Sequence, residues 1–235
     1  VNSFVARYTP PNANVIHQWR LNETSGTSFV DAVSGSNMSL DNSLTPGTPI
    51  LVGLNSIFEG GAVRTRNNNN SIYTANTGVV TPPSQSLSMD CWIKQDGAGG
   101  SGYIFGRQWK DPQDISSYSA IALATAGNGT LGYWMTVNGG SETGAYSKVT
   151  YGPSTDTWRH IGLTYDGANV RLYVDGDNVF TEARTGDVDF RFSAPWFVSN
   201  LKLPTTSRPF SGKIVDCRVH NIVRPESYFR SVYNL

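Results

Sequence analysis

The sequence predicts an all-β protein, a two-sheet antiparallel β-sandwich of jelly-roll type with a short C-terminal helix. In several short runs, apolar and polar residues alternate with period two, which is the signature of strands with one buried face. Turn residues separate these runs at fairly even spacing, as is typical of sandwiches and jelly rolls. The alternating runs are 87–93, 131–137, 158–165, 170–174 and 214–219.

The connections and the C-terminal segment agree with this fold class. Asp-Gly pairs at 166–167 and 175–176 supply the positive-φ residues that tight hairpins need. Helical spacing is confined to 225–233, where Pro225 suits a first helical position and apolar residues such as Phe229 recur three or four residues apart. We therefore expect one short helix after the last strand.

The composition excludes several classes of protein. The 235 residues carry 18 Lys and Arg against 18 Asp and Glu, so the net charge is zero, and no basic run points to nucleic acid. No stretch approaches the ~18 apolar residues that a membrane span needs. Aromatic residues make up 11% of the chain and include six Trp, which is too many for a disordered protein.

The length favours one large β domain, because sandwiches often reach roughly 200–250 residues as a single unit. We assign 1–14, with Pro10-Pro11, to an extended N-terminal arm and 15–235 to the sandwich. No signal peptide is visible at the start, which is compatible with its earlier removal. The low charge and the many Asn, Ser, Thr and Gly residues suit an extracellular protein or one on a virion surface.

Two cysteines, Cys91 and Cys217, are too few for a disulfide framework. Both lie within strand-like runs, so burial as free thiols is favoured, because free Cys behaves as a small apolar residue. A single bridge between them stays open as the alternative.

Four segments resemble laminin-G-like jelly rolls of the concanavalin A-like lectin/glucanase superfamily, in the order that this family has them. They are 17–27 (HQWRLNETSGT), 88–94 (SMDCWIK), 158–167 (WRHIGLTYDG) with 172–176 (LYVDG), and 210–221 (FSGKIVDCRVHN). The third is the most specific. The resemblance implies two antiparallel sheets, one concave and one convex, over about residues 15–235.

Several residues of these segments are expected to be structural. Tryptophans within apolar runs are expected in the core: Trp19, Trp92 and Trp158. His160, between Trp158 and Ile161, is expected to form a hydrogen bond between strands. His17 and His220 lie near strand ends and have no partner that the local sequence reveals.

Catalysis is not expected. Glycan hydrolases of this superfamily place two glutamates four or five residues apart on one strand, so that one carboxyl protonates the leaving group and the other attacks. Here no two glutamates are closer than Glu23 and Glu59. The pairs Asp175/Asp177 and Asp187/Asp189 have strand spacing, but turn aspartates usually bind backbone. Gly-x-Ser-x-Gly, phosphate-loop and zinc spacings are all missing from the sequence.

The resemblance also implies a structural calcium ion between the opening loop and the last strand, with Asp31 and Asp216 as its carboxylates. Calcium takes six to eight oxygen ligands, so backbone carbonyls, for example at Ser34 or Gly35, would complete the set. The alternative is that Asp31 caps a turn and Asp216 pairs with a cation.

Sugar recognition needs exposed aromatic faces and planar polar groups. In the run 131–137, alternation puts Trp134 on the face opposite Leu131, Tyr133 and Met135, so that Trp134 projects outward if those three residues are core. The candidate ligand-binding residues are Trp134, Trp109, Tyr118, Tyr146 and Trp196.

We expect a non-catalytic recognition or adhesion module that binds glycans or a protein partner. The alternative is a structural decoration or tail subunit of a virus or phage particle, in which 1–14 contacts capsid or tail proteins. A glycan hydrolase is a remote third. One fold carries many functions, so the site has to decide between these hypotheses.

Overall fold

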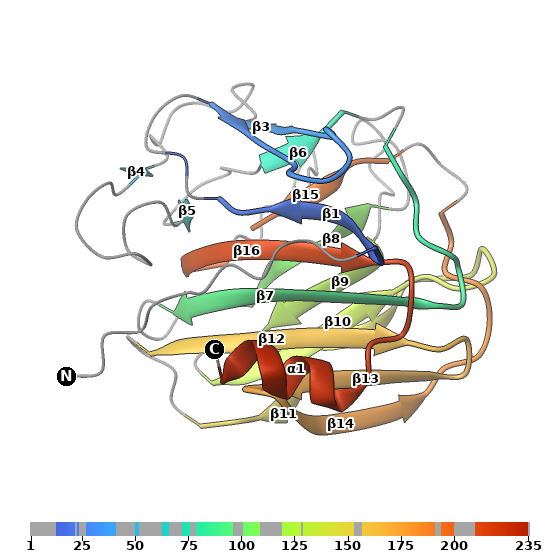
Figure 1. Cartoon of the computed structure of the whole chain (residues 1–235). Coiled ribbons are helices and arrows are strands. Elements are labelled where there is room, and N and C mark those ends of the chain that lie inside the picture. Colours follow the sequence, from blue (N-terminus) through green and yellow to red (C-terminus); the bar gives the residue numbers. More distant parts are fainter. Residues whose placement is uncertain are drawn as a thin grey trace.

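Two antiparallel sheets stack face to face in the computed structural model of the chain, and a short helix lies against the outside of one of them (Figure 1). This confirms the predicted fold class. The structure describes residues 13–21, 23, 27–40, 50–51, 63–65, 72–75, 79–95, 101–108, 119–127, 129–152, 157–190, 194–199 and 210–234. The predicted arm over 1–14 lies almost wholly outside the described residues.

Counted over the described residues, each sheet has eight strands. The first sheet has the order β14 (Asp177–Ala183), β13 (Asn169–Val174), β12 (Trp158–Tyr165), β7 (Leu87–Gln95), β16 (Gly212–His220), β5 (Val63–Thr65) and β4 (Ile50–Leu51), and β1 (Val15–Trp19) also pairs with β16. The second sheet has the order β11 (Thr143–Thr150), β10 (Thr130–Met135), β9 (Ser119–Thr125), β8 (Gly102–Gln108), β15 (Trp196–Val198), β6 (Ile72–Thr74), β3 (Met38–Leu40) and β2 (Ser28–Phe29).

The predicted hairpins form as expected. Between β13 and β14, Asp175 has a φ of 52° and Gly176 a φ of 95°, as a tight turn with two positive-φ residues requires. The Asp175 carboxylate accepts a hydrogen bond from the backbone N–H of His160 at 3.0 Å and pairs with Arg159. This aspartate therefore supports a turn, as the sequence indicated.

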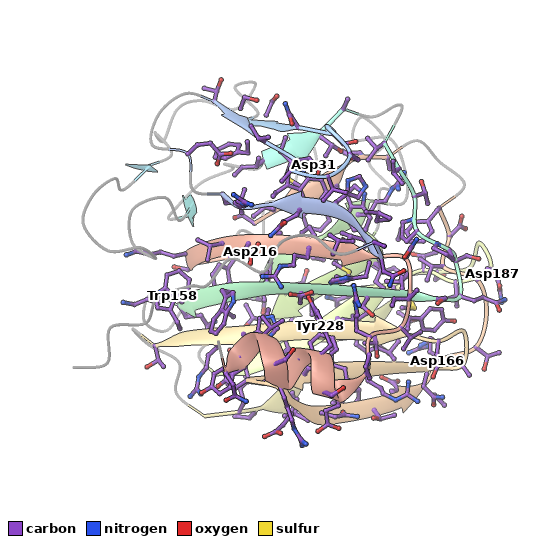
Figure 2. All side chains as sticks on the ribbon, viewed as in Figure 1. Asp31, Trp158, Asp166, Asp187, Asp216 and Tyr228 are labelled. Atoms are coloured by element: carbon purple, nitrogen blue, oxygen red, sulfur yellow. The ribbon has the colours of Figure 1, made fainter. Side chains whose placement is uncertain are left out.

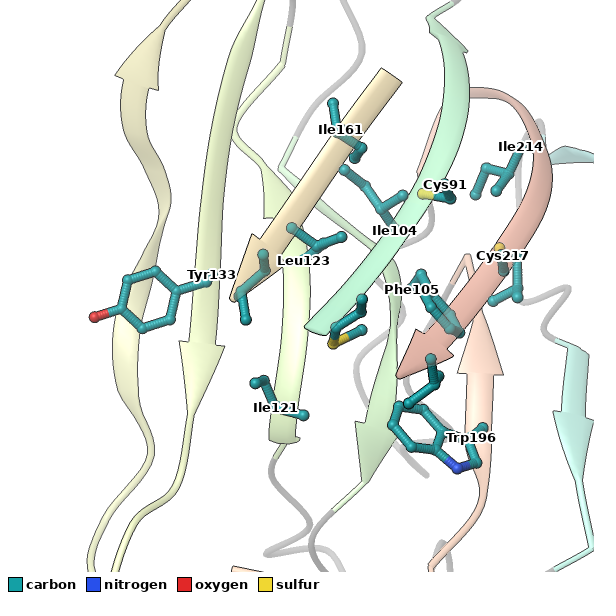
Figure 3. Packing of buried hydrophobic residues seen from close by; sticks show 14 of the residues in the cluster. Cys91, Ile104, Phe105, Ile121, Leu123, Tyr133, Ile161, Trp196, Ile214 and Cys217 are labelled. Atoms are coloured by element: carbon teal, nitrogen blue, oxygen red, sulfur yellow. The ribbon is translucent and has the colours of Figure 1, made fainter. Parts of the chain in front are cut away.

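The inner faces of the two sheets enclose one apolar core. Ile104 and Leu123 of the second sheet meet Cys91 and Ile161 of the first, and all four are fully buried (Figure 3). Both cysteines are free and buried. Trp19 is also fully buried here, whereas the other two tryptophans that were expected in the core are not part of it.

The helix α1 (Glu226–Tyr233) packs on the outer face of the first sheet, as Figure 1 shows. Its buried residues are Phe229 and Val232. Trp92 packs against Val232 beneath the helix, and Trp158 is only partly buried beside it. Helix and sheet therefore enclose a second, smaller apolar layer, which explains why these two tryptophans lie outside the main core.

Polar residues connect the two sheets at the edge formed by β14 and β11. The Tyr133 hydroxyl donates to Glu182 at 2.8 Å, and Lys148 of β11 pairs with the same carboxylate at 2.9 Å. Arg184 also pairs with Glu182, at 3.2 Å. Burial raises the pKa of Glu182, but these partners together hold it below the usual range. Ion pairs and hydrogen bonds therefore join the two sheets at the edge formed by β14 and β11.

Candidate functional site

Aromatic side chains gather on the outer face of the second sheet, on the side that does not meet the first sheet. This outer-face cluster consists of Tyr73, Tyr103, Trp134, Tyr146 and Phe197, with Ala122 and Ala124. Five strands contribute to it, namely β6, β8, β10, β11 and β15, together with the two alanines of β9. Outward faces of antiparallel sheets are commonly polar, whereas here most members of the cluster are buried and only Trp134 and Tyr146 are partly exposed.

Strand alternation explains how Trp134 reaches this face. Its neighbours Tyr133 and Met135 point into the core and are fully buried, while Trp134 is only partly buried. The facing that the sequence predicted for this strand is therefore what the structure has. Directly across the strands from Trp134 lie Ala122 and Gly144.

The rings of the cluster make edge-on contacts. Trp134 and Tyr146 lie 5.2 Å apart between ring centres at 68°, and Tyr103 and Tyr146 lie 5.3 Å apart, also at 68°. Tyr103 meets Phe197 at 5.9 Å and 89°. These geometries are the favourable ones for aromatic pairs. Trp134 and Tyr146 are partly exposed, whereas Tyr103 and Phe197 are buried, so the first two form the accessible part.

Two polar groups accompany these rings. The indole N–H of Trp134 is buried and has no hydrogen-bond partner among the described residues. Glu142 accepts a hydrogen bond from the backbone N–H of Ser119 at 2.6 Å, and burial raises its pKa above the usual range. Burial and the charge of Glu142 both raise the pKa of Tyr103. The partly exposed rings therefore lie beside a buried N–H and a carboxyl that accepts a backbone hydrogen bond.

The other predicted ligand-binding residues do not join this cluster. Trp196 is fully buried in the core, where its ring packs against Trp19 and Phe105. Its strand is short, and Phe197 rather than Trp196 faces outward. This differs from the expectation, and we do not consider Trp196 further as a stacking surface. Trp109 and Tyr118 lie outside the described residues.

Asp31, a predicted calcium ligand, is held by hydrogen bonds within its own turn and to β1. Its Oδ1 accepts the backbone N–H groups of Gln18 and Val33, both at 3.0 Å, and its Oδ2 accepts from His17 at 2.7 Å and from Ser34. Burial opposes ionisation, but these donors lower the pKa of Asp31 to about 2.

Asp216, the second predicted ligand, pairs with the guanidinium of Arg218 and accepts from Gln18 Nε2 at 2.8 Å. It has a φ of 53° at an irregularity in the pairing of β16 with β7. Figure 2 shows Asp31 and Asp216 in the upper part of this view. Because both carboxylates already accept hydrogen bonds and one faces a cation, the donor set fits calcium poorly. The turn-and-ion-pair alternative describes these contacts, and calcium stays a prediction from the sequence resemblance.

A buried carboxylate, Asp90, lies on the outer face of the first sheet, where α1 packs, and was not predicted from the sequence. Asp90 Oδ2 lies 3.1 Å from His160 Nε2, and Asp90 Oδ1 lies 2.7 Å from His220 Nε2. The expected interstrand hydrogen bond of His160 is therefore confirmed. His17 and His220 both have carboxylate partners that no local pattern revealed, since Asp31 and Asp90 lie 14 and 130 residues away.

Fold and surface together define a lectin-like jelly roll with an aromatic outer face. The family model described as "Concanavalin A-like lectin/glucanases superfamily" matches residues 66–227, and the chain belongs to this family, Laminin_G_3. A comparison with curated proteins gives no match. Among the described residues, no helix has the length and apolar character to cross a membrane.

Solved structures share the fold at low sequence identity. Botulinum neurotoxin type C, described as dependent on two ganglioside molecules for cell entry, is 18% identical with a TM-score of 0.63 over 94% of this chain and 51% of that one. Trypanosoma rangeli sialidase is 10% identical with a TM-score of 0.64, covering 98% and 35%. Domain 4 of the arabinanase AbnA from Geobacillus stearothermophilus, in complex with arabinotriose, is 13% identical with a TM-score of 0.56, covering 94% and 98%. The chain thus spans about half the neurotoxin structure and a third of the sialidase.

Proposed function

We propose that this protein is a non-catalytic, extracellular recognition module that binds glycans through the outer-face cluster. The observation that carries the proposal is the partly exposed indole of Trp134, with the partly exposed Tyr146 ring beside it. A pyranose presents apolar C–H faces and a rim of hydroxyls, so its C–H face can stack on the exposed part of these rings.

The neighbouring residues suit this role. Tyr146 meets Trp134 edge-on and extends the surface along β11, and its phenol adds a polar tip to an apolar ring. Several structural neighbours are described with gangliosides, sialic acid or arabinotriose, which supports a glycan as the ligand class.

The described carboxylates support a binding role over hydrolysis. Glycoside hydrolysis needs two carboxyl groups facing one bond, roughly 5–9.5 Å apart. Near the cluster, Glu142 accepts the Ser119 amide. Glu182 is engaged by Tyr133, Lys148 and Arg184 at the sandwich edge. The alternative role is a virion or tail subunit in which 1–14 contacts capsid or tail proteins, and that segment lies almost wholly outside the described residues.

Trp134→Ala tests the proposal. We expect the wild-type protein to bind oligosaccharides on a glycan array, and the variant to bind the same glycans about tenfold more weakly or worse, because it loses the stacking surface. Isothermal titration with the best array ligand measures the change.

Trp158→Ala is the matched control, since it removes a partly buried indole from the first sheet. Its affinity should equal that of the wild type, with both variants keeping the far-ultraviolet circular dichroism of a β-protein. Equal glycan affinity in wild type and Trp134→Ala would refute the outer-face site.

A further inference from the structure

A cavity of about 520 Å³ lies at one end of the sandwich, apart from the outer-face cluster residues. Three chain segments line it: the loop before β7, the turn after β10 and the segment after β14. Figure 2 places Asp187, one of its lining residues, at the margin of the molecule on the side opposite Trp158. Its size falls within the range of small-ligand sites, roughly 300–1,000 Å³.

Hydrogen bonds fix these segments against one another. Asn138 and Asp187 bind each other twice, with Asn138 N donating to Asp187 O and Asp187 N donating to Asn138 Oδ1, both at 2.9 Å. Ser84 Oγ donates to Asp187 Oδ1 at 2.6 Å, and Val188 N donates to Ser84 O at 3.0 Å. The cavity wall is therefore organised before a ligand arrives, which lowers the cost of binding.

These bonds leave a donor and an acceptor unused. Because Asn138 Oδ1 accepts from the backbone of Asp187, its amide nitrogen is a donor, and no described residue accepts from it. Asp187 Oδ2 likewise has no partner among the described residues, while Oδ1 is taken by Ser84. Phe190 adds an apolar ring, and Val188 adds an apolar side chain to the lining.

We propose that this cavity binds the end of a neutral sugar. A hydroxyl donates to a carboxylate and accepts from an amide, so a pair of neighbouring hydroxyls satisfies Asp187 and Asn138 together, and a C–H face packs on Phe190. An ammonium or guanidinium ligand would satisfy Asp187 but leave the Asn138 amide unmatched, because cationic groups only donate. This inference rests on the proposed glycan binding and adds a second subsite with its own selectivity.

Charge sets that selectivity. Asp187 is the exposed acidic side chain of the described lining, whereas Asp189 is buried and has partners of its own. Arg107 lies 5.5 Å from the Phe190 ring centre, but it is buried and donates to Ala194 O, Val80 O and Thr81 Oγ1. A sugar carboxylate would meet like charge here, so the cavity selects against uronic and sialic acids.

The test compares matched pairs of monosaccharides that differ in one carboxylate: galactose with galacturonic acid, and glucose with glucuronic acid. Titration calorimetry measures affinity, and the side-chain amide resonance of Asn138 in the NMR spectrum reports contact. We expect the neutral member of a pair to bind at least about tenfold more tightly and to shift that resonance.

Asn138→Gly removes the amide, and glycine adopts the φ of 52° at this position without strain. We expect Asn138→Gly to weaken binding of the neutral sugar about tenfold. We expect Asp187→Asn to narrow the ratio of the affinities for the neutral and the acidic sugar. Asp177→Asn, at the exposed start of β14 where Asp177 pairs with Arg230 of α1, is the charge-matched control and should leave both values unchanged.

The outcomes separate this inference from the proposed function. Equal or tighter binding of the uronic acid, or an undiminished affinity in Asn138→Gly, would overturn the cavity assignment. So would a wild-type protein that holds oligosaccharides through Trp134 but binds no monosaccharide of the panel, and that result leaves the proposed function intact. Loss of all sugar binding in the wild type would overturn both.

Discussion

Among the described carboxylates of the first sheet, Asp90 has the most polar partners. It meets His160 and His220, and the Tyr228 hydroxyl of α1 reaches its Oδ1 at 3.3 Å. Arg218 lies 3.7 Å from its Oδ2. Burial alone would raise the pKa of Asp90, but these donors and the Arg218 charge hold it well below its ordinary value. The carboxylate stays ionised because every neighbour donates to it.

The tautomer of His220 follows from its two neighbours. Arg224 Nε donates to His220 Nδ1 at 3.0 Å, so that nitrogen is an acceptor and the proton resides on Nε2, facing Asp90. Protonation of Nδ1 would set an N–H against the Arg224 N–H. Burial lowers the pKa of His220 more than Asp90 raises it, and the charges of Arg224 and Arg218 lower it further.

Stability should therefore fall with acidity in two steps. A histidine in the unfolded chain titrates near pH ~6.5, whereas folded His220 resists the proton, so its contribution is present above that pH and lost below it. The slope is at most about 1.4 kcal/mol per pH unit for one proton. The depressed pKa of Asp90 adds a second loss below about pH 4, where the unfolded carboxyl protonates. Urea unfolding between pH 8 and 3 measures both steps.

His220→Gln assigns the first step. Glutamine keeps a donor for Asp90 and an acceptor for Arg224 but does not titrate. We expect the free energy of unfolding to become flatter between pH 7 and 5, with the loss below pH 4 retained. A slope in this range that is the same in wild type and variant would assign the first step to another group.

At the scale of elements, the place of α1 on the sheet depends on a residue without a side chain. A Cβ at Gly162 of β12 would come within 2.3 Å of the Phe229 ring, and Phe229 stacks on Tyr173 at 4.0 Å. The helix therefore seats its largest buried side chain in the space above Gly162. Gly162 has an ordinary φ, so the requirement is for space and not for a special backbone conformation.

Gly162→Ala should destabilise the protein by about 1–3 kcal/mol, because the added methyl overlaps an aromatic ring that is itself fully buried. Chemical denaturation of Gly162→Ala, Phe229→Ala and the double variant measures the coupling. We expect Gly162→Ala to cost little once Phe229 is already truncated. Equal costs of Gly162→Ala in both backgrounds would show that α1 does not depend on this contact.

The strands that the sequence predicted are those in which apolar residues alternate with polar or small ones. The run 158–165 coincides with β12, and 170–174 lies within β13, although most residues of β12 are buried. β9 had no such signal: all seven of its residues are buried, since the outer-face cluster covers its outward alanines. β14 was not predicted either, because its residues are exposed or half-buried and no apolar face stands out.

Prediction of the site was limited in the same way. Trp134 was predictable because its facing depends on its own strand. The cluster around it was not, because Tyr103, Trp134 and Phe197 belong to strands that only the sheet order brings together. Trp196 was expected to bind ligand but lies in the core, because the sequence does not say which of two adjacent aromatic residues in β15 faces inward.

At the scale of the whole molecule, the core extends beyond the family match. The match begins at residue 66, yet Trp19 of β1 is fully buried, stacks on His17 at 4.8 Å and contacts Trp196 and Phe105. β1 also pairs with β16 near the C-terminal end of the chain. The described parts of the N-terminal region therefore contribute to the same interior as the matched segment, and we expect one cooperative folding unit.

Alkylation of the two cysteines tests whether this folding unit opens in a single step. Cys91 and Cys217 lie on neighbouring strands within the core (Figure 3), and burial, together with the neighbouring Cys91 thiol, raises the pKa of Cys217. Thiolate, not thiol, reacts with iodoacetamide, so both cysteines should resist alkylation in the folded protein and react in urea. The midpoint of alkylation should coincide with that of tryptophan fluorescence, because all-or-none opening exposes core thiols and rings together. Mass spectrometry counts the alkylated sites, and the intact mass distinguishes two thiols from a bridge by two hydrogen atoms. Labelling at lower urea than the fluorescence change would mean that β7 and β16 separate before the rest of the sandwich opens.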